Sequence, residues 1–449
     1  MTRAATSTLK DTGIPWLGHV PDDWTVQPIK HSSYIKARVG WKGLTSEEFE
    51  TSAYAYLVTG TDFRGQFIDW KSCYQVNEER YLDDPFIQLR DGDLLITKDG
   101  TIGKLSLVSG LDKPASLNSG IFVVRPQESY STRFLYWVLS SRVFEDYVAL
   151  TSTGSTILHL YQNVFEQFSF GFPSLEAQTS IADFLDRETA QIDALIGKQE
   201  RLIELLAEKH QAIITHAVTK GLDSTAPTKP SGIPWLGEIP AHWTVTKVKH
   251  HFSATLGKML QSANQPLESS VVIPYLRAGN IQPGGIDLNE VKQMPFTPAE
   301  AKALDLRTDD LVVVEGGAGF GRSDVLKCDL VGWGFQNHVI RVRSRASLST
   351  GFLDLVLKMS LANGLIANLS NHATIPSLSS DKLLNLEFPA PPRDEAERIC
   401  SHVEGRLIRL RDLTNSAKGV ISLLRERRSA LISAAVTGKI DVHAEGTGN

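Results

Sequence analysis

The chain has 449 residues, of which 42% are hydrophobic and 22% charged, and its formal net charge is −5. It is too long for one ordinary hydrophobic core, and no apolar run approaches the roughly 20 residues that span a bilayer. The negative balance excludes a simple basic nucleic-acid binder, the three distant cysteines form no disulfide framework or zinc motif, and the polar N-terminus lacks a signal peptide, so a cytoplasmic protein is expected.

The first predicted element is an opening segment that occurs twice. GIPWLGHVPDDWTVQPIKH begins at Gly13 and GIPWLGEIPAHWTVTKVKH at Gly232, and 12 of the 19 positions are identical. The final histidines, His31 and His250, end charged segments and are expected to be structural or surface residues. We expect the tryptophans to anchor the segment by burial: Trp16, Trp24, Trp235 and Trp243. Such a repeat predicts two similar structural units.

Short runs of β-branched and aromatic residues follow the opening segment in each copy. Runs bounded by Gly, Asp or Pro predict strands: SAYAYLVTG, DLLITKDG and SGIFVVRP in the first copy, and VVIPYLRAG, DLVVVEGG and HVIRVRS in the second. SSRVFEDYVAL and LDLVLKMSLANGL predict helices. Strands and helices do not alternate regularly, which favours an α+β domain over a doubly wound sheet.

Two glycine-rich runs, DGTIGK from Asp99 and GGAGFGR from Gly316, superficially resemble phosphate-binding loops. A P-loop needs four residues between its first glycine and the Gly-Lys pair, whereas Gly100 and Gly103 are separated by two. Both runs lie between predicted strands, so tight turns or bulges are the better interpretation. A nucleotide-binding enzyme is therefore the least favoured alternative.

Each copy ends in a long predicted helix, from Glu176 to Thr219 in the first. Apolar residues recur there in alternating steps of four and three, which is typical of a coiled-coil seam. The predicted seam residues of the first helix are Ile181, Leu185, Ile192, Leu195, Leu202, Leu206 and Ile213. Those of the second helix are Ile399, Val403, Leu410, Leu413, Val420, Leu424 and Leu431. We expect helices of this length to bury their seams on each other.

The predicted fold class is α+β, with two mixed α/β target-recognition domains arranged with pseudo-two-fold symmetry and separated by two long helices that form an antiparallel coiled coil. The predicted boundaries are 1–172 for the first domain, 173–231 for the central helix and linker, 232–392 for the second domain, and 393–449 for the C-terminal helix and tail.

Motifs for catalysis and metal binding are missing from both copies. The sequence contains no H-E-x-x-H, no G-x-S-x-G and no paired Cys/His cluster with zinc spacing. We therefore expect no catalytic residue, metal or cofactor on this chain. A binding protein is favoured over an enzyme, and a coiled-coil scaffold that binds only protein is the other alternative.

The order of these segments, given twice at a nearly constant offset, resembles the specificity (S) subunit of Type I restriction–modification systems from about Gly13 to Asp441. The resemblance implies a non-catalytic subunit in which each target-recognition domain recognises one half of a bipartite, asymmetric site in double-stranded DNA. It implies two modification (M) subunits, which carry S-adenosylmethionine and methylate adenine, and restriction (R) subunits that use ATP and Mg²⁺. It implies no association with a membrane.

Candidate DNA contacts are polar residues in loops that differ between the copies, because such side chains recognise base edges. In the first copy they are Lys36, Arg38, Lys42, Arg64, Lys98, Lys104, Asn118, Ser155 and Thr156. In the second copy they are Lys258, Arg277, Asn280, Arg322, Asn337, His338, Arg343 and Thr374. Arg341, Arg343 and Arg345 alternate along one predicted strand, so they share a face that we expect to lie toward the DNA backbone. The alternative for each residue is a solvated surface side chain.

Overall fold

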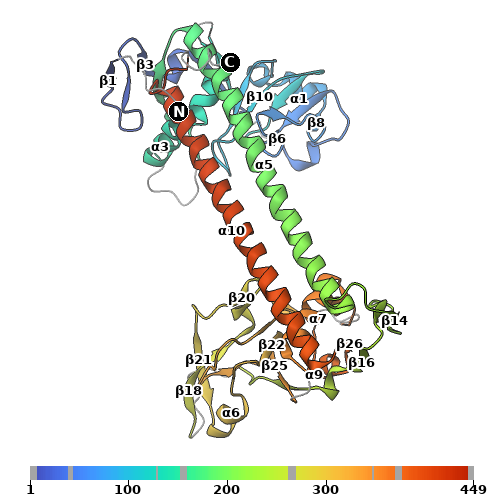
Figure 1. Cartoon of the computed structure of the whole chain (residues 1–449). Coiled ribbons are helices and arrows are strands. Elements are labelled where there is room, and N and C mark those ends of the chain that lie inside the picture. Colours follow the sequence, from blue (N-terminus) through green and yellow to red (C-terminus); the bar gives the residue numbers. More distant parts are fainter. Residues whose placement is uncertain are drawn as a thin grey trace. The chain divides into compact units, whose positions relative to one another are not determined.

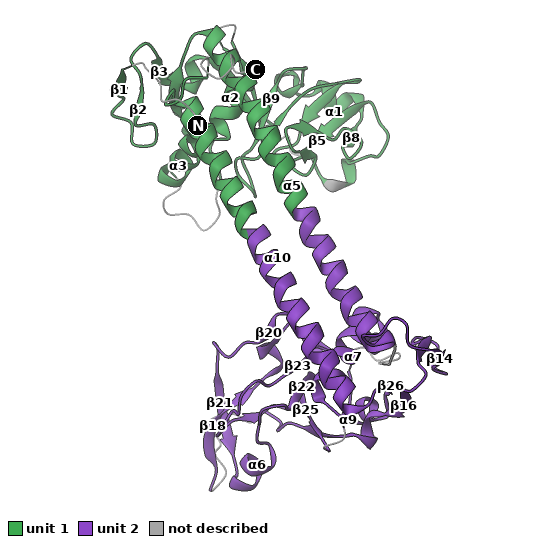
Figure 2. Cartoon of the chain, viewed as in Figure 1, with its two compact units in different colours: residues 1–199, 419–449 green, residues 200–418 purple. Residues whose placement is uncertain are grey.

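The computed structural model describes residues 8–38, 44–127, 130–151, 159–260, 269–345, 348–369 and 377–442. The chain divides into two compact units: unit 1 comprises residues 1–199 and 419–449, and unit 2 comprises residues 200–418 (Figure 2). The division crosses both long helices, so each unit combines a globular part with a part of each helix. The four predicted domain segments are continuous stretches of sequence, unlike these units, and they stay a prediction.

The described residues of unit 1 form many short strands and four short α-helices. The strands are β1 (Leu9–Asp11), β2 (His19–Pro21), β3 (Thr25–Pro28), β4 (Ser33–Ala37), β5 (Ala55–Val58), β6 (Phe63–Arg64), β7 (Phe67–Ile68), β8 (Tyr74–Val76), β9 (Leu94–Thr97), β10 (Leu105–Leu107), β11 (Ala115–Leu117), β12 (Ile121–Pro126) and β13 (Ser169–Phe172). The helices are α1 (Glu78–Leu82), α2 (Thr132–Leu139), α3 (Arg142–Thr151) and α4 (Gln162–Phe165).

These strands form two larger sheets and two small ladders. The sheets have the orders β4-β12-β9-β10-β7-β6 and β11-β5-β8, and the ladders join β1 to β2 and β13 to β3. Most pairs are antiparallel, whereas β7 with β10 and β5 with β11 are parallel. The unit is therefore of the predicted mixed α+β class.

Unit 2 repeats this plan with its own strands and helices. The strands are β14 (Thr228–Pro230), β15 (Glu238–Pro240), β16 (Thr244–Lys247), β17 (Phe252–Leu256), β18 (Val271–Leu276), β19 (Ile281–Gln282), β20 (Gly285–Ile286), β21 (Lys292–Phe296), β22 (Leu311–Val314), β23 (Ser323–Val325), β24 (Gly334–Phe335), β25 (Val339–Ser344) and β26 (Glu387–Ala390). The helices are α6 (Pro298–Ala303), α7 (Thr350–Ala362), α8 (Leu365–Leu369) and α9 (Ser380–Asn385). The main sheets have the orders β17-β25-β22-β23 and β21-β18-β24, and ladders join β14 to β15, β16 to β26 and β19 to β20.

The central strands of both units are buried on both faces. In β9, Leu94 and Ile96 enter one hydrophobic core and Leu95 enters another. In β22, Leu311 and Val313 enter one core, and Val312 and Val314 enter a second. Continuous apolar runs such as DLLIT and DLVVV follow from this arrangement, since a strand covered on both faces has no polar side.

Two long helices dominate the remainder of the chain (Figure 1). They are α5 (Leu175–Lys220), with 46 residues, and α10 (Arg393–Val436), with 44. In unit 1 the first turns of α5 and the last turns of α10 share one core, and Asp193 of α5 accepts from Arg428 of α10 at 3.0 Å. In unit 2 the last turns of α5 share a core with the first turns of α10. The two helices are therefore antiparallel within each unit.

The structure differs from the predicted seam at four positions. It buries Leu185, Ile192 and Leu206 of α5 and Val403 and Leu410 of α10. It exposes Leu195 at 46%, Leu202 at 40%, Leu413 at 53% and Val420 at 41%. The residues that follow them are the half-buried Ile196, Ile203 and Thr414 and the buried Ile421.

At three of these four positions the physical reason for the correction is a pair of neighbouring apolar residues, whereas Leu413 is followed by the polar Thr414. Leu195 is followed by Ile196, and Leu202 by Ile203, so a step of three and a step of four both lead to an apolar residue. Periodicity alone does not choose between these two registers. In the structure the next buried seam residue after Leu185 is Thr189, a step of four residues, whereas the predicted register takes a step of three there.

The tryptophans of the opening segments anchor each unit. Trp24 is 6% exposed and Trp243 is fully buried, as predicted, whereas Trp16 and Trp235 are half-buried and pack against the cores of their units. A Cβ atom on Gly438, just after α10, would lie 3.0 Å from the ring of Trp24, and one on Gly221, just after α5, would lie 3.2 Å from that of Trp243. Both glycines have positive φ, of 67° and 71°, which suits the residue after a helix. The end of a long helix thus closes each unit against its opening segment.

Candidate nucleic-acid interface

The glycine-rich runs are turns between antiparallel strands. In unit 1 the N–H of Thr97 donates to the carbonyl of Lys104 at 2.9 Å, which closes the connection between β9 and β10, and Gly103 has a φ of +83°. In unit 2 the N–H of Val314 donates to the carbonyl of Arg322 at 2.8 Å, which closes the connection between β22 and β23. The prediction of tight turns is confirmed, and a phosphate-binding loop opening a helix is not formed.

Three chain segments meet where the strand enters each glycine turn. In unit 1 the N–H of Lys98 donates to the carbonyl of Gly120, and its own carbonyl accepts from the N–H of Leu160, both at 2.9 Å. In unit 2 Glu315 makes the same two backbone hydrogen bonds, at 3.0 and 2.8 Å. We call this place the turn rim and define it by Lys98, Asp99, Gly120, His159 and Leu160 in unit 1 and by Glu315, Gly316, His338, Ser377 and Leu378 in unit 2.

Several predicted DNA contacts lie on or beside the turn rim. The ammonium group of Lys98 is 3.7 Å from the carboxylate of Asp99, and Lys104 is exposed at the far end of the turn. Asn118 precedes the rim, and its side-chain oxygen accepts from the N–H of Ser119 at 2.7 Å. In unit 2 the candidates here are Arg322, Asn337 and His338. The fold thus gathers candidates from separate parts of each copy.

Two other predicted contacts are buried in the framework. Arg38 is 2% exposed and donates to the carbonyl of Leu117 at 2.9 Å, and its burial lowers the pKa of the guanidinium. Lys258 is 9% exposed and donates to the carboxylate of Glu300 at 2.5 Å. In the free chain, therefore, these two cations hold their own domains together.

Arg277 and Asn280 also make contacts within their domain. The guanidinium of Arg277 donates to Glu290 at 2.9 Å. Asn280 is buried, and its side-chain amide donates to the carbonyls of Asp287 and Glu290 at 2.7 and 3.2 Å. The amide thereby fixes the loop that follows it.

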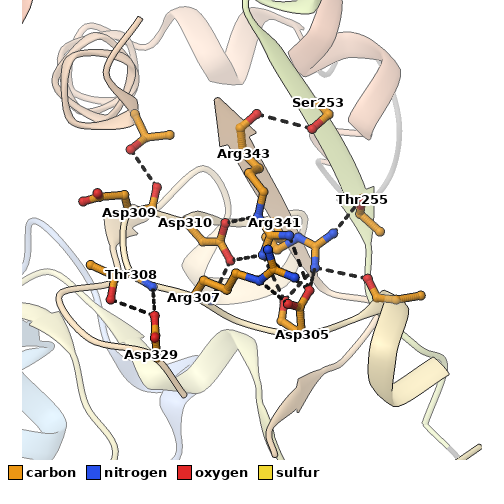
Figure 3. A network of polar contacts seen from close by, with 12 residues as sticks. Ser253, Thr255, Asp305, Arg307, Thr308, Asp309, Asp310, Asp329, Arg341 and Arg343 are labelled. Atoms are coloured by element: carbon orange, nitrogen blue, oxygen red, sulfur yellow. Dashed lines mark hydrogen bonds and ion pairs between the residues drawn. The ribbon is translucent and has the colours of Figure 1, made fainter. Parts of the chain in front are cut away.

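The alternating arginines of β25 belong to an internal ionic network (Figure 3). Arg343 donates to both carboxylate oxygens of Asp310, each at 2.6 Å, and hydrogen bonding to this carboxylate raises the pKa of the guanidinium. Arg341 is 7% exposed and donates to the carbonyl and the carboxylate of Asp305 at 2.6 and 3.1 Å. Of the three alternating arginines, Arg341, Arg343 and Arg345, only Arg345, which follows β25, is exposed. The structure therefore differs from the expected row of backbone contacts.

The remaining candidates divide into two groups. Lys36 and Arg64 are exposed on β4 and β6 of unit 1 and stay predictions. Four others lie outside the described residues: Lys42, Ser155, Thr156 and Thr374.

The sequence analysis did not predict His159 of the turn rim or Tyr161 beside it. His159 approaches the carboxylate of Asp99 through Nδ1. Tyr161 is 61% exposed, and its ring centroid lies 4.5 Å from that of His159. The candidates of the first copy are lysines, arginines, Asn118 and two hydroxyl residues. The repeat gives no signal for His159 or Tyr161 because the second copy has Ser377 and Ser379 at these places.

Unit 1 has a hollow beside the glycine turn. It has a volume of about 600 Å³ and is lined by residues of the turn and of α2 and α3, among them Ile102, Lys104, Tyr136, Ser140 and Phe144. The described residues contain no group of three His, Cys, Asp or Glu side chains that could hold a metal ion. In the same part of the chain, no helix is both long and apolar enough to cross a membrane.

Comparison with known proteins shows that part of the chain matches a family model. Residues 45–205 match the model of the Type I restriction modification DNA specificity domain. The Type I restriction enzyme MjaVIII specificity subunit of Methanocaldococcus jannaschii is 24% identical over 429 residues, covering 94% of this chain and 94% of that protein.

Solved structures share the fold. The structure described as "Structural basis underlying complex assembly and conformational transition of the type I R-M system" aligns with a TM-score of 0.66 at 16% identity, covering 94% of this chain and 99% of the other. The HsdS subunit from Thermoanaerobacter tengcongensis aligns with a TM-score of 0.53 at 15% identity, covering 94% and 98%.

Proposed function

We propose that this chain, which belongs to the specificity subunits of Type I restriction–modification systems, assigns one part of a bipartite DNA site to each of its two units. As in its family, the chain is the DNA-recognising component and performs no chemistry of its own. The observation that carries the proposal is the turn rim, where the backbone hydrogen bonds are the same in both units and the side chains differ.

The differing side chains account for an asymmetric site. Lys98 in unit 1 corresponds to Glu315 in unit 2, which reverses the charge at one position of the same framework. Gly120 corresponds to His338, which replaces an open position with an imidazole. Sequence readout depends on donors and acceptors aimed at base edges, so two rims with different side chains select different base pairs.

The long helices supply docking surfaces for protein partners. Each helix exposes three apolar residues on one face, at positions i, i+7 and i+10. They are Leu195, Leu202 and Leu205 on α5 and Leu413, Val420 and Leu423 on α10, with exposures from 40% to 66%. Corresponding residues are 218 positions apart, so the two helices carry equivalent stripes.

Two equivalent stripes support two copies of one partner. Exposed apolar stripes at helical spacing fit the packing of further helices. We assign them to two modification subunits, which would carry S-adenosylmethionine and methylate adenine within the recognised site. Restriction subunits, with ATP and Mg²⁺, would join this assembly, and the chain itself would need no cofactor.

The adenine methylome tests this proposal. The chain would be expressed with its partner methyltransferase, and the methylated positions compared with those of a strain that lacks only this gene. The proposal expects a gapped, two-part motif that disappears with the gene. An unchanged methylome in the presence of an active methyltransferase would contradict it and favour a scaffold that binds only protein.

A further inference from the structure

We propose that His159 and His338 are paired DNA-contacting residues, one for each half-site, although they occupy non-equivalent positions in the two copies. The proposal rests on the DNA-recognition function above and adds to it a residue, His159, that neither the repeat nor the family resemblance indicates. It follows from the two turn rims, where three segments are joined by the same backbone hydrogen bonds.

Each rim carries one histidine at one of two facing positions. In unit 1 Gly120 lies beside Asp99, and a Cβ atom on Gly120 would lie 3.7 Å from the Cβ of Asp99. The histidine of this rim is His159, which belongs to the third of the joined segments and pairs with Asp99. In unit 2 the histidine occupies the position of Gly120, as His338, and the third segment contributes Ser377. A small residue thus faces the histidine's segment in both units, and each rim holds a single imidazole.

Both imidazoles have a carboxylate beside Nδ1. Nδ1 of His159 faces the carboxylate of Asp99, and Nδ1 of His338 lies 3.4 Å from the carboxylate of Glu315. A carboxylate at Nδ1 fixes the orientation and tautomer of the ring and leaves Nε2 for another partner. Within the described ranges no hydrogen bond to Nε2 of either ring occurs, and the side chains are 31% and 51% exposed.

The free Nε2 atom has the chemistry of a DNA contact. It donates a hydrogen bond when the ring is protonated and accepts one when the ring is neutral. Base edges and phosphate oxygens both offer suitable partners, and a base contact gives sequence information whereas a phosphate contact gives position. At the rim of unit 1 the exposed ring of Tyr161 lies beside the imidazole, and the ammonium group of Lys98 lies 3.7 Å from the carboxylate of Asp99.

The test uses the complex of the full chain with its methyltransferase and a duplex that carries the motif found in the methylome. The variants are His159→Ala and His338→Ala, and the controls are His31→Ala and His250→Ala, which are exposed and occupy equivalent positions of the opening segments. Binding is measured on duplexes in which one half-site is kept and the other is randomised.

We expect His159→Ala to weaken binding about tenfold where the half-site of unit 1 is kept, and His338→Ala to do so for the half-site of unit 2, since a hydrogen bond to a charged group contributes on this scale. Both controls should bind within twofold of the wild type. A base contact would relax specificity at one base pair, whereas a phosphate contact would weaken all sequences equally and lower the salt dependence by about one phosphate.

Other outcomes separate this inference from the proposed function. If the wild-type complex shows specific binding and both rim variants match the controls, the inference fails and the proposed function stands. If the wild type shows no sequence-specific binding, both fail. Asp99→Asn and Glu315→Gln keep the side-chain volume and remove the charge at Nδ1, so they should give a smaller loss in the same half-site. A loss in both half-sites from any one variant would contradict the pairing.

Discussion

The two units share an ionic anchor and differ in the interior beside the glycine turn. In unit 1 Arg125 donates to both oxygens of Asp93 at 2.6 and 2.9 Å, and in unit 2 Arg343 donates to both oxygens of Asp310 at 2.6 Å. In each case the carboxylate also accepts from the backbone N–H three residues before it, at 2.8 Å. The anchor couples two neighbouring strands, β9 to β12 and β22 to β25, and fixes the base of the turn.

The interior beside the glycine turn differs between the two units. In unit 2 Lys358 on α7 lies 2.6 Å from the carboxylate of Asp354 and 3.4 Å from that of Asp324. Gly321 is packed so closely that a Cβ would lie 3.0 Å from Leu361 and Ile366. The corresponding place in unit 1 is the hollow of about 600 Å³. The repeat thus preserves what holds the turn and varies what surrounds it, which is the expected pattern for one framework that serves two recognition surfaces.

The largest effect is expected from breaking the shared anchor. Arg343→Met leaves Asp310, whose side chain is 1% exposed, as a buried carboxylate without its cation, and should lower the free energy of unfolding of unit 2 by about 4 kcal/mol. Arg125→Met should act similarly on unit 1. Chemical denaturation measures both, with Arg345→Met as the exposed control. A loss below that of the control would show that the anchor is not structural.

Substitutions in the interior beside the glycine turn are expected to change stability less, and in opposite directions in the two units. Lys358→Met leaves the buried Asp354, whose pKa is raised by burial, and should cost about 3 kcal/mol. Ser140→Met, at the equivalent position, extends into the hollow and should change stability by less than about 1 kcal/mol, toward stabilisation. Thermal unfolding of both variants compares them. Equal destabilisation would mean that the two interiors do not differ as described.

The revised seam predicts a contrast between two leucines of one helix. Leu410→Ala removes a side chain that is 7% exposed and should cost about 2 kcal/mol, whereas Leu413→Ala removes one that is 53% exposed and should cost less than about 0.5 kcal/mol. The measurement is the denaturation midpoint of the free chain. Comparable losses from both variants would support the register predicted from the sequence, in which both leucines belong to the seam.

The smallest effect concerns acid stability of unit 2. The hydrogen bond from Lys258 holds the pKa of Glu300 below its usual range. A carboxyl group whose pKa is lower in the folded chain contributes stability above the unfolded-state pKa and loses it as the pH falls through the folded-state pKa. Glu300→Gln should therefore slightly flatten the fall in melting temperature below about pH 5, with the exposed Glu290→Gln as the control. Parallel curves for wild type and Glu300→Gln would contradict this.

The sequence was a good guide wherever the two copies agree. The opening segments predicted four buried tryptophans; Trp24 and Trp243 are buried, and Trp16 and Trp235 are half-buried. The glycine spacing predicted turns and excluded a P-loop, and both runs connect antiparallel strands. The long helices followed from apolar periodicity, which depends only on local spacing.

The sequence was a poor guide to side-chain partners. Arg343 and Arg341 looked like a cationic surface because alternation along a strand is visible in sequence, whereas the carboxylates of Asp305 and Asp310 that bind them are brought there by another strand and its turn. His159 was missed for the same reason, since its neighbour Asp99 lies 60 positions earlier. Contacts between distant segments need the fold.

The most direct test of the account replaces residues 13–172 with the matching domain of a relative that recognises a different site and determines the adenine methylome. We predict that one half of the gapped motif changes to that of the donor, while the other half and the gap stay the same. A change in both halves, or in neither while methylation continues, would contradict the assignment of one half-site to each unit.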